Sequence, residues 1–107
     1  MYVRAADADG ANWFSPQAVD TAGNVGSNNS LAAVNGRPAI SYYDLVNGDL
    51  KFIQANDADG DYPWSIPLTL DSGGIVGDYT SLVVVNGGPA VSYHDVTNLD
   101  LKYIKLY

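Results

Sequence analysis

Aromatic rings beside aspartate and asparagine side chains are the most suggestive chemical groups in this 107-residue sequence. Such groups bind sugars, because an aromatic face packs on the C–H surface of a sugar while carboxylate and amide oxygens accept hydrogen bonds from its hydroxyls. They occur twice, about 50 residues apart. We therefore expect the ligand-binding residues to be Trp13, Trp64, Tyr43, His94, Asp44, Asp95, Asn47 and Asn98. The competing interpretation is that the rings pack adjacent repeats together and that the Asp–Asn pairs hold turns.

Ser92, His94 and Asp95 are the residue types of a hydrolase triad, but their spacing argues against one. Neighbours on a strand point to opposite faces, so His94 and Asp95 diverge. Ser92 shares the face of His94 but lies about 7 Å along the strand. The matching residue of the first repeat is Tyr43, so this position accommodates an aromatic ring and does not need a base. We predict no catalytic residues.

The segment Asp57–Asp61 resembles a calcium-binding loop at first sight. An EF-hand loop needs acidic ligands at its first, third and fifth positions and a bidentate acid at its twelfth. Ala55 and Ile66 fall at the first and twelfth positions when Gly60 is placed at the sixth. We therefore predict a turn, in which Asp binds its own backbone and Gly takes a positive φ, with no metal and no cofactor.

A sialidase-like glycosidase is the enzyme alternative. Such an enzyme would use several arginines to bind a carboxylate, together with a tyrosine or carboxylate nucleophile. Only Arg4 and Arg37 are present, and Gln54 and Gly88 replace them in the second repeat. The sequence thus favours a protein that is not an enzyme.

Charge and composition exclude several other classes. All twelve acidic residues are Asp, the net charge is −7, and there is no cysteine. A basic face is needed to bind nucleic acid or an anionic membrane, so we expect neither as a partner. Disulfide frameworks and thiolate metal sites are excluded as well. No apolar run suits a signal peptide or a membrane span, so neither is predicted for this chain.

An internal repeat positions these residues. Residues 2–51 align with residues 52–102, with Pro63 as the only insertion, and residues 103–107 begin a third copy of the same strand. We treat residues 1–107 as a single two-repeat module. Each repeat predicts four short strands and no helix.

The segment from Ser30 to Leu70 contains all four predicted strands. Strands are expected at Ser30–Val34, Pro38–Asp44, Asp49–Ala55 and Trp64–Leu70. The dipeptide Asn35-Gly36 is typical of a two-residue type I′ turn, since both of its central residues need positive φ. The first three strands of this pattern recur one repeat later, within residues 80–107.

Four-stranded repeats of this length are typical of β-propeller blades. The fold class is therefore all-β, with a sandwich of two similar halves as the alternative. Propellers close with about four to eight blades, so two repeats predict a ring of several copies. Three copies are favoured, with two, four or a longer natural array left open. The third strand occurs at both ends, Tyr2–Ala6 and Tyr103–Tyr107, so one copy should be displaced or add a fifth strand.

Several segments resemble tandem repeats of uncharacterised bacterial surface or secreted proteins. They are Gly77–Leu82, Pro89–Asp95, Asn98–Tyr103 and the Ser-Tyr-Tyr-Asp…Asn-Gly-Asp-Leu-Lys pattern of Ser41–Lys51. Those repeats are interpreted as propeller blades, so the resemblance implies this fold and a secreted or cell-surface origin, but no substrate. Leu99 stands where the first repeat has Gly48, which predicts a less regular turn.

The sequence as a whole predicts a non-catalytic binding or scaffold module that self-assembles into a closed ring, with carbohydrate as the expected ligand class. The alternative is a purely structural or engineered assembly unit without a ligand. A sialidase-like fragment is the less favoured third hypothesis.

Overall fold

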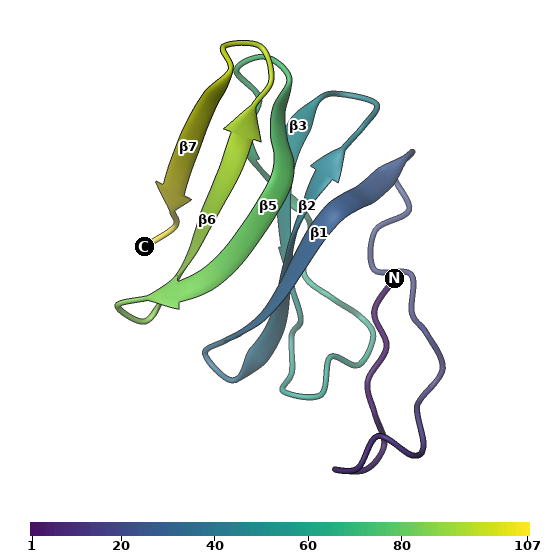
Figure 1. The fold of residues 1–107 in the computed structure, drawn as a ribbon. Helices are drawn as coiled ribbons and strands as arrows, with labels where there is room; N and C mark the ends of the chain where they lie inside the picture. The colour runs from purple at the N-terminus through teal and green to yellow at the C-terminus, as the bar shows by residue number, and fades with distance from the viewer.

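Residues 1–107 form an all-β structure in the computed structural model, with seven strands in two antiparallel sheets and no helix (Figure 1). The first sheet has the order β1-β2-β3-β4 and the second the order β5-β6-β7. The strands are β1 (Val25–Val34), β2 (Arg37–Asp44), β3 (Asp49–Gln54), β4 (Leu68–Asp71), β5 (Val76–Val85), β6 (Gly88–Asp95) and β7 (Asp100–Lys105). No helix in the structure is long and apolar enough to cross a membrane.

The tight turns between the first two strands of each sheet form as predicted. Asn35 and Gly36 have φ values of 51° and 73°, and Asn86 and Gly87 have values of 49° and 78°. Two consecutive positive φ values define the type I′ turn, whose twist matches that of the strands it joins. The pairing therefore runs in the same register in the two sheets, from Val34↔Arg37 in one and from Val85↔Gly88 in the other.

Two strand starts in the first sheet differ from the prediction by four or five residues. β1 begins at Val25 rather than Ser30, and its pairing with β2 continues through two register shifts. β4 begins at Leu68 rather than Trp64, which makes only an isolated bridge to Ala55. Pro67 has no N–H to donate, so regular pairing can start only after it.

Residues 2–17 form an irregular hairpin, the N-terminal hairpin, beside the first sheet (Figure 1, purple). The predicted strands Tyr2–Ala6 and Trp13–Val19 are reduced to two bridges, Tyr2↔Gln17 and Ala5↔Trp13. These bridges correspond to Phe52↔Leu68 and Ala55↔Trp64 one repeat later. The hairpin thus has the register of strands β3 and β4.

Both copies of the third strand are paired in this chain. Tyr2 pairs with Gln17, and Tyr103 pairs with Ser92 of β6. The predicted displacement or fifth strand concerns a closed ring, in which the two copies would meet at one position. Tyr2 belongs to the N-terminal hairpin and Tyr103 to the second sheet, so the two do not compete here.

The larger hydrophobic core lies between the two sheets. The first sheet contributes Val34, Ala39, Leu50 and Phe52, and the second contributes Val76, Leu82, Val91 and Tyr93. Because strand residues alternate between faces, these are alternate positions of the central strands. The two sheets therefore pack face to face, and we call this contact the inner junction.

A smaller core lies on the opposite face of the first sheet. It consists of Tyr2, Ile40, Tyr42, Ile53, Ala55 and Trp64, with Val19 and Val25 packed against it. The N-terminal hairpin supplies Tyr2 and Val19, so it covers part of this face. The first sheet is thus packed on both sides, whereas the second is packed on one.

Candidate functional site

The two tryptophans occupy the same local conformation but differ in exposure. The indole N–H of Trp13 donates a hydrogen bond to the carbonyl of Gly10, and that of Trp64 donates to Gly60, both at 2.8 Å. Trp13 is 58 % exposed, whereas Trp64 is 9 % exposed. The difference arises because the ring of Tyr2 packs edge-on against Trp64, with the centroids 5.0 Å apart.

Tyr43 and His94 lie on matching faces of β2 and β6. Tyr43 is buried and shares its face with Ser41, whose hydroxyl is 2.8 Å from that of Thr80 on β5. That face belongs to the inner junction. His94 is half-buried and pairs with Leu101 of β7, which is exposed. Tyr43 is therefore a packing residue, and its counterpart His94 lies on a face that nothing in this chain covers.

Asp44 and Asp95 hold the turns that follow β2 and β6. The Asp44 carboxylate accepts hydrogen bonds from the backbone N–H groups of Val46 and Asn47 and from the Asn47 side chain, at 2.8–3.1 Å. Burial raises the pKa of Asp44, but these hydrogen bonds outweigh it and lower the pKa overall. The Asp95 carboxylate binds Asn98 in the same way, and the side-chain hydrogen bond of Asn98 is the main cause of its lowered pKa.

The Asp57–Asp61 segment is a turn held by one carboxylate. The Asp57 side chain accepts hydrogen bonds from the backbone N–H groups of Asp59, Gly60 and Asp61, at 2.8–3.1 Å. Gly60 has a φ of 75°. No three acidic or histidine side chains gather anywhere in the structure as a metal site would require.

The eight predicted ligand-binding residues do not form one site. The tryptophans lie at the loops that follow the third strands, and the Asp–Asn pairs lie at the loops that follow the second strands. Most of their polar groups already have partners within the chain. Binding of a sugar at these residues therefore stays a prediction.

A set of residues that the ligand prediction did not include joins one sheet to the next. Asp71 ends β4, and its carboxylate accepts hydrogen bonds from the Tyr93 hydroxyl and the Lys102 ammonium group, both at 2.7 Å. Asp20 follows the N-terminal hairpin and accepts a hydrogen bond of 2.5 Å from Tyr42. We call these the inter-sheet cluster (Asp71, Tyr93, Lys102) and the N-terminal cluster (Asp20, Tyr42, Lys51).

In both clusters the pKa of the aspartate is lowered and the pKa of the tyrosine is raised. Burial and the hydrogen bonds of Tyr93 and Lys102 have opposing effects on Asp71, and the net result lowers its pKa to about 2. Burial, followed by the hydrogen bond to Asp71, raises the pKa of Tyr93. Burial, followed by the hydrogen bond to Asp20, raises the pKa of Tyr42 in the same way. Each tyrosine thus stays protonated and each aspartate ionised, whereas a tyrosine nucleophile would need a lowered pKa.

The internal repeat indicates which residue types form these clusters. Asp20, Tyr42 and Lys51 recur as Asp71, Tyr93 and Lys102. Recurrence alone does not show which residues are in contact, because each aspartate is 22 positions from its tyrosine and lies outside the sheet that contains the tyrosine. Only the packing of consecutive units brings them together.

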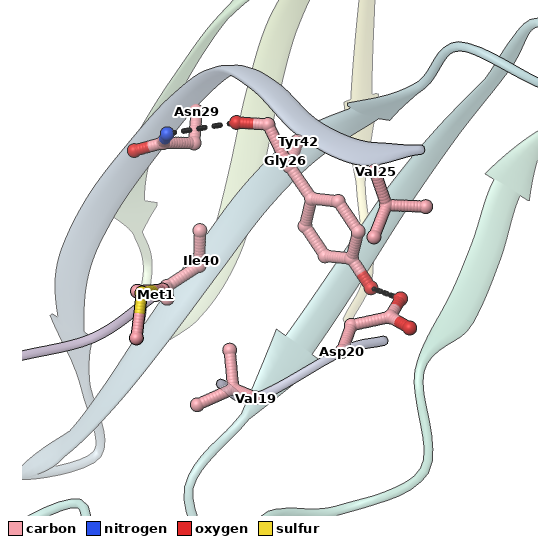
Figure 2. A pocket seen from close by; sticks show the side chains of 8 residues that line it. All are labelled: Met1, Val19, Asp20, Val25, Gly26, Asn29, Ile40 and Tyr42. Atoms are coloured by element: carbon pink, nitrogen blue, oxygen red, sulfur yellow. Dashed lines mark hydrogen bonds between the residues drawn. The ribbon is translucent and has the colours of Figure 1, made fainter. Parts of the chain in front are cut away.

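A shallow cleft lies beside the N-terminal cluster. Figure 2 shows its lining, which includes Val25, Gly26, Ile40 and Tyr42, with the Tyr42–Asp20 hydrogen bond at one side. The corresponding place at the inner junction is filled. A methyl group added at Gly77 would lie 2.5 Å from the Cα of Leu50, whereas one at Gly26 would meet nothing within 4 Å.

The uncovered faces at the two ends of the molecule match the two sides of the inner junction. On the first sheet, Leu31 is 57 % exposed, whereas its counterpart Leu82 is 7 % exposed. On the second sheet, Leu101 and Tyr103 are 85 % and 60 % exposed, whereas their counterparts Leu50 and Phe52 are at most 3 % exposed. We call Val25, Gly26 and Leu31 the leading face, and Val85, Leu101 and Tyr103 the trailing face.

No protein-family model, no curated protein and no solved structure matches this chain.

Proposed function

We propose that this protein is a non-catalytic scaffold module whose two sheets are β-propeller blades and whose copies assemble into a closed ring. Three copies, giving six blades, are the favoured number. Each inter-copy contact would place the trailing face of one copy on the leading face of the next. Such a head-to-tail contact generates a ring when the rotation closes.

The observation that carries the proposal is the match between the inner junction and the uncovered faces. The inner junction buries Leu50 and Phe52 against Val76 and Leu82. The same positions one repeat away are Leu101 and Tyr103 on one end and Val25 and Leu31 on the other, and three of these four are large exposed apolar side chains. Large apolar patches of this kind mark interaction surfaces.

The N-terminal cluster gives independent support. Its Asp20 lies at the position of Asp71 and contacts Tyr42 as Asp71 contacts Tyr93. The N-terminal hairpin therefore sits on the first sheet as the outer part of a preceding blade would. The inner part of such a blade corresponds to β5 and β6, which a second copy can supply.

The first test measures the absolute mass in solution by light scattering after size exclusion. We expect one species at an integer multiple of 11.4 kDa, with three as the favoured multiple. Leu101→Asp and Leu31→Asp should each reduce this mass to that of a single chain, since each puts a charge into the contact. Ile66→Asp is the matched control, because Ile66 is 84 % exposed but lies on neither face.

A compact wild-type monomer would contradict the ring and favour a sandwich of two similar halves. An assembled species that tolerates both face substitutions would show that the copies associate elsewhere. Each proposed substitution replaces an exposed side chain, so an unfolded variant is not expected. Circular dichroism of the three variants checks this point.

Carbohydrate binding is the second candidate function, and the exposure of Trp13 is the observation that favours it. Saturable binding of the single-chain form in a glycan screen that is lost in Trp13→Ala would support it. In the proposed ring, Trp13 takes the position of Trp64 in a completed blade and becomes covered. Absence of binding to any glycan would therefore leave the scaffold function alone, and hydrolysis of aryl-glycosides would be needed to support an enzyme.

A further inference from the structure

We propose that residues 2–6 of one copy replace residues 103–107 of the preceding copy in its second sheet, so that neighbouring copies exchange a strand segment. This inference rests on the proposed ring. It goes beyond it by stating which of the two equivalent segments pairs with β6 at each inter-copy contact. The segment 103–107 is released, and Tyr2 of the next copy then takes the place of Tyr103 in the trailing face.

The two segments have the same place in the repeat. Tyr2, Val3 and Arg4 correspond to Tyr103, Ile104 and Lys105, and both triplets align with the end of β3. When the second sheet of one copy sits on the first sheet of the next, both segments are directed to one position beside β6. Only one of them can pair there.

The contacts of Tyr2 favour keeping the N-terminal hairpin in place. Tyr2 is 7 % exposed, its ring packs on Trp64, and its hydroxyl donates a hydrogen bond of 3.1 Å to the carbonyl of Asp59. Its ring also leaves no room for a Cβ at Gly60, from which it would be 2.7 Å away. Gln17, its partner in the bridge, donates to the carbonyl of Gly60 at 2.9 Å.

The segment 103–107 pairs with β6, accepts a hydrogen bond of 3.2 Å from the Asn35 side chain at the Tyr107 hydroxyl and contacts Gly88 through Tyr107, but its side chains are more exposed. Tyr103 and Tyr107 are 60 % and 61 % exposed. Ile104 and Leu106 pack only at the margin of the larger core. Release of this segment therefore uncovers less apolar surface than release of Tyr2 would.

The hydrogen bonds lost on release are replaced by equivalent ones. The backbone N–H of Leu106 donates to Pro89, as that of Ala55 donates to Pro38 one repeat earlier. Ala5 of the incoming copy holds the same position as Leu106 and Ala55. The exchange thus preserves the backbone pairing of β6.

The cleft beside the N-terminal cluster supports the same register. Met1 lines this cleft and corresponds to Lys51, the residue that follows Leu50. Leu101 of the preceding copy would enter the cleft as Leu50 fills the inner junction. Lys102 of one copy and Met1 of the next then meet where the strand passes from one copy to the other.

Engineered disulfides test the exchange, and the absence of native cysteine gives a clean background. Val91 pairs with Ile104 within the chain, so Val3→Cys with Val91→Cys should link copies, while Val91→Cys with Ile104→Cys is the matched control. Both pairs are oxidised after the assembled species has been isolated. We expect most of the Val3/Val91 protein to form covalent multimers on a non-reducing gel and most of the Val91/Ile104 protein to keep free thiols.

The outcomes separate this inference from the ring itself. A wild-type mass of a single chain overturns both. A ring in which the Val91/Ile104 disulfide closes and the Val3/Val91 link does not form overturns the exchange alone. As a second readout that needs no cysteine, a chain ending at Lys102 should assemble to the same number of copies, and failure to assemble would contradict the exchange.

Discussion

Replacing Asp71 by Asn tests the energetic role of the inter-sheet cluster. The Asp71 side chain is 15 % exposed and binds both Tyr93 and Lys102 at 2.7 Å. Its pKa falls from 3.8 to about 2, and a difference of about 1.8 at 1.36 kcal/mol for each pKa unit gives about 2.4 kcal/mol. Because Lys102 is 37 % exposed, solvent screening reduces this to about 1–2 kcal/mol.

The pH dependence has a definite sign. A carboxyl group whose pKa is lowered in the folded state stabilises it fully above the unfolded pKa, and this contribution is lost as the pH falls through the folded value. The stabilisation by Asp71 is therefore lost between about pH 4 and pH 2. Urea unfolding followed by circular dichroism should show Asp71→Asn less stable than wild type by about 1–2 kcal/mol at neutral pH, with a difference near zero at the acid limit.

Two other substitutions serve as controls. Asp9→Asn removes the same charge from an exposed loop and should leave the free energy of unfolding unchanged. Asp20→Asn should destabilise in the same direction as Asp71→Asn but by less, because Lys51 lies 3.7 Å from Asp20. Equal losses for Asp9→Asn and Asp71→Asn, or a loss for Asp71→Asn that persists in acid, would refute this account of the cluster.

Two backbone substitutions give further predictions. Leu99 is 78 % exposed with a φ of 63°, where Gly48 has 72°, so Leu99→Gly should raise the free energy of unfolding by about 0.5–1 kcal/mol; a loss in thermal or urea unfolding would contradict it. Gly77→Ala should cost about 1–3 kcal/mol more than Gly26→Ala, because only Gly77 faces Leu50. Gly26→Ala should reduce the assembled mass measured by light scattering, because Gly26 lies on the leading face. Equal losses of unfolding free energy in the two variants would contradict the packing of Gly77 against Leu50 at the inner junction.

Local signals predicted the parts of the fold that depend on local conformation. The Asn-Gly turns need two consecutive positive φ values, and that need is visible in the residue types. The all-β fold and the positions of the central strands follow from these turns and the apolar stretches between them. The start of β1 was missed because Val25–Asn29 contains Gly and Asn, which rarely favour strands, and the chain there pairs through register shifts.

The candidate site was harder to predict because it depends on which units face one another. Trp13 and Trp64 have the same local sequence pattern and the same hydrogen bond to a glycine carbonyl, yet only Trp64 is covered by Tyr2. The carboxylates chosen for ligand binding, Asp44 and Asp95, hold turns. The sequence shows that Asp20 recurs as Asp71, but it does not show that their partners are Tyr42 and Tyr93, which belong to the unit packed against each aspartate.

The division of the larger core between two sheets has a consequence for how the chain unfolds. Four of its eight residues come from each sheet, so the larger core is lost from both sheets if they separate, and the first sheet keeps only the smaller core. Unfolding of a single chain should therefore be one cooperative transition rather than two. In arrays of stacked units, stability is approximately a sum of unit and nearest-neighbour terms, so tandem fusion of further copies should raise the midpoint with each added contact, and the outermost units should exchange their amide hydrogens first.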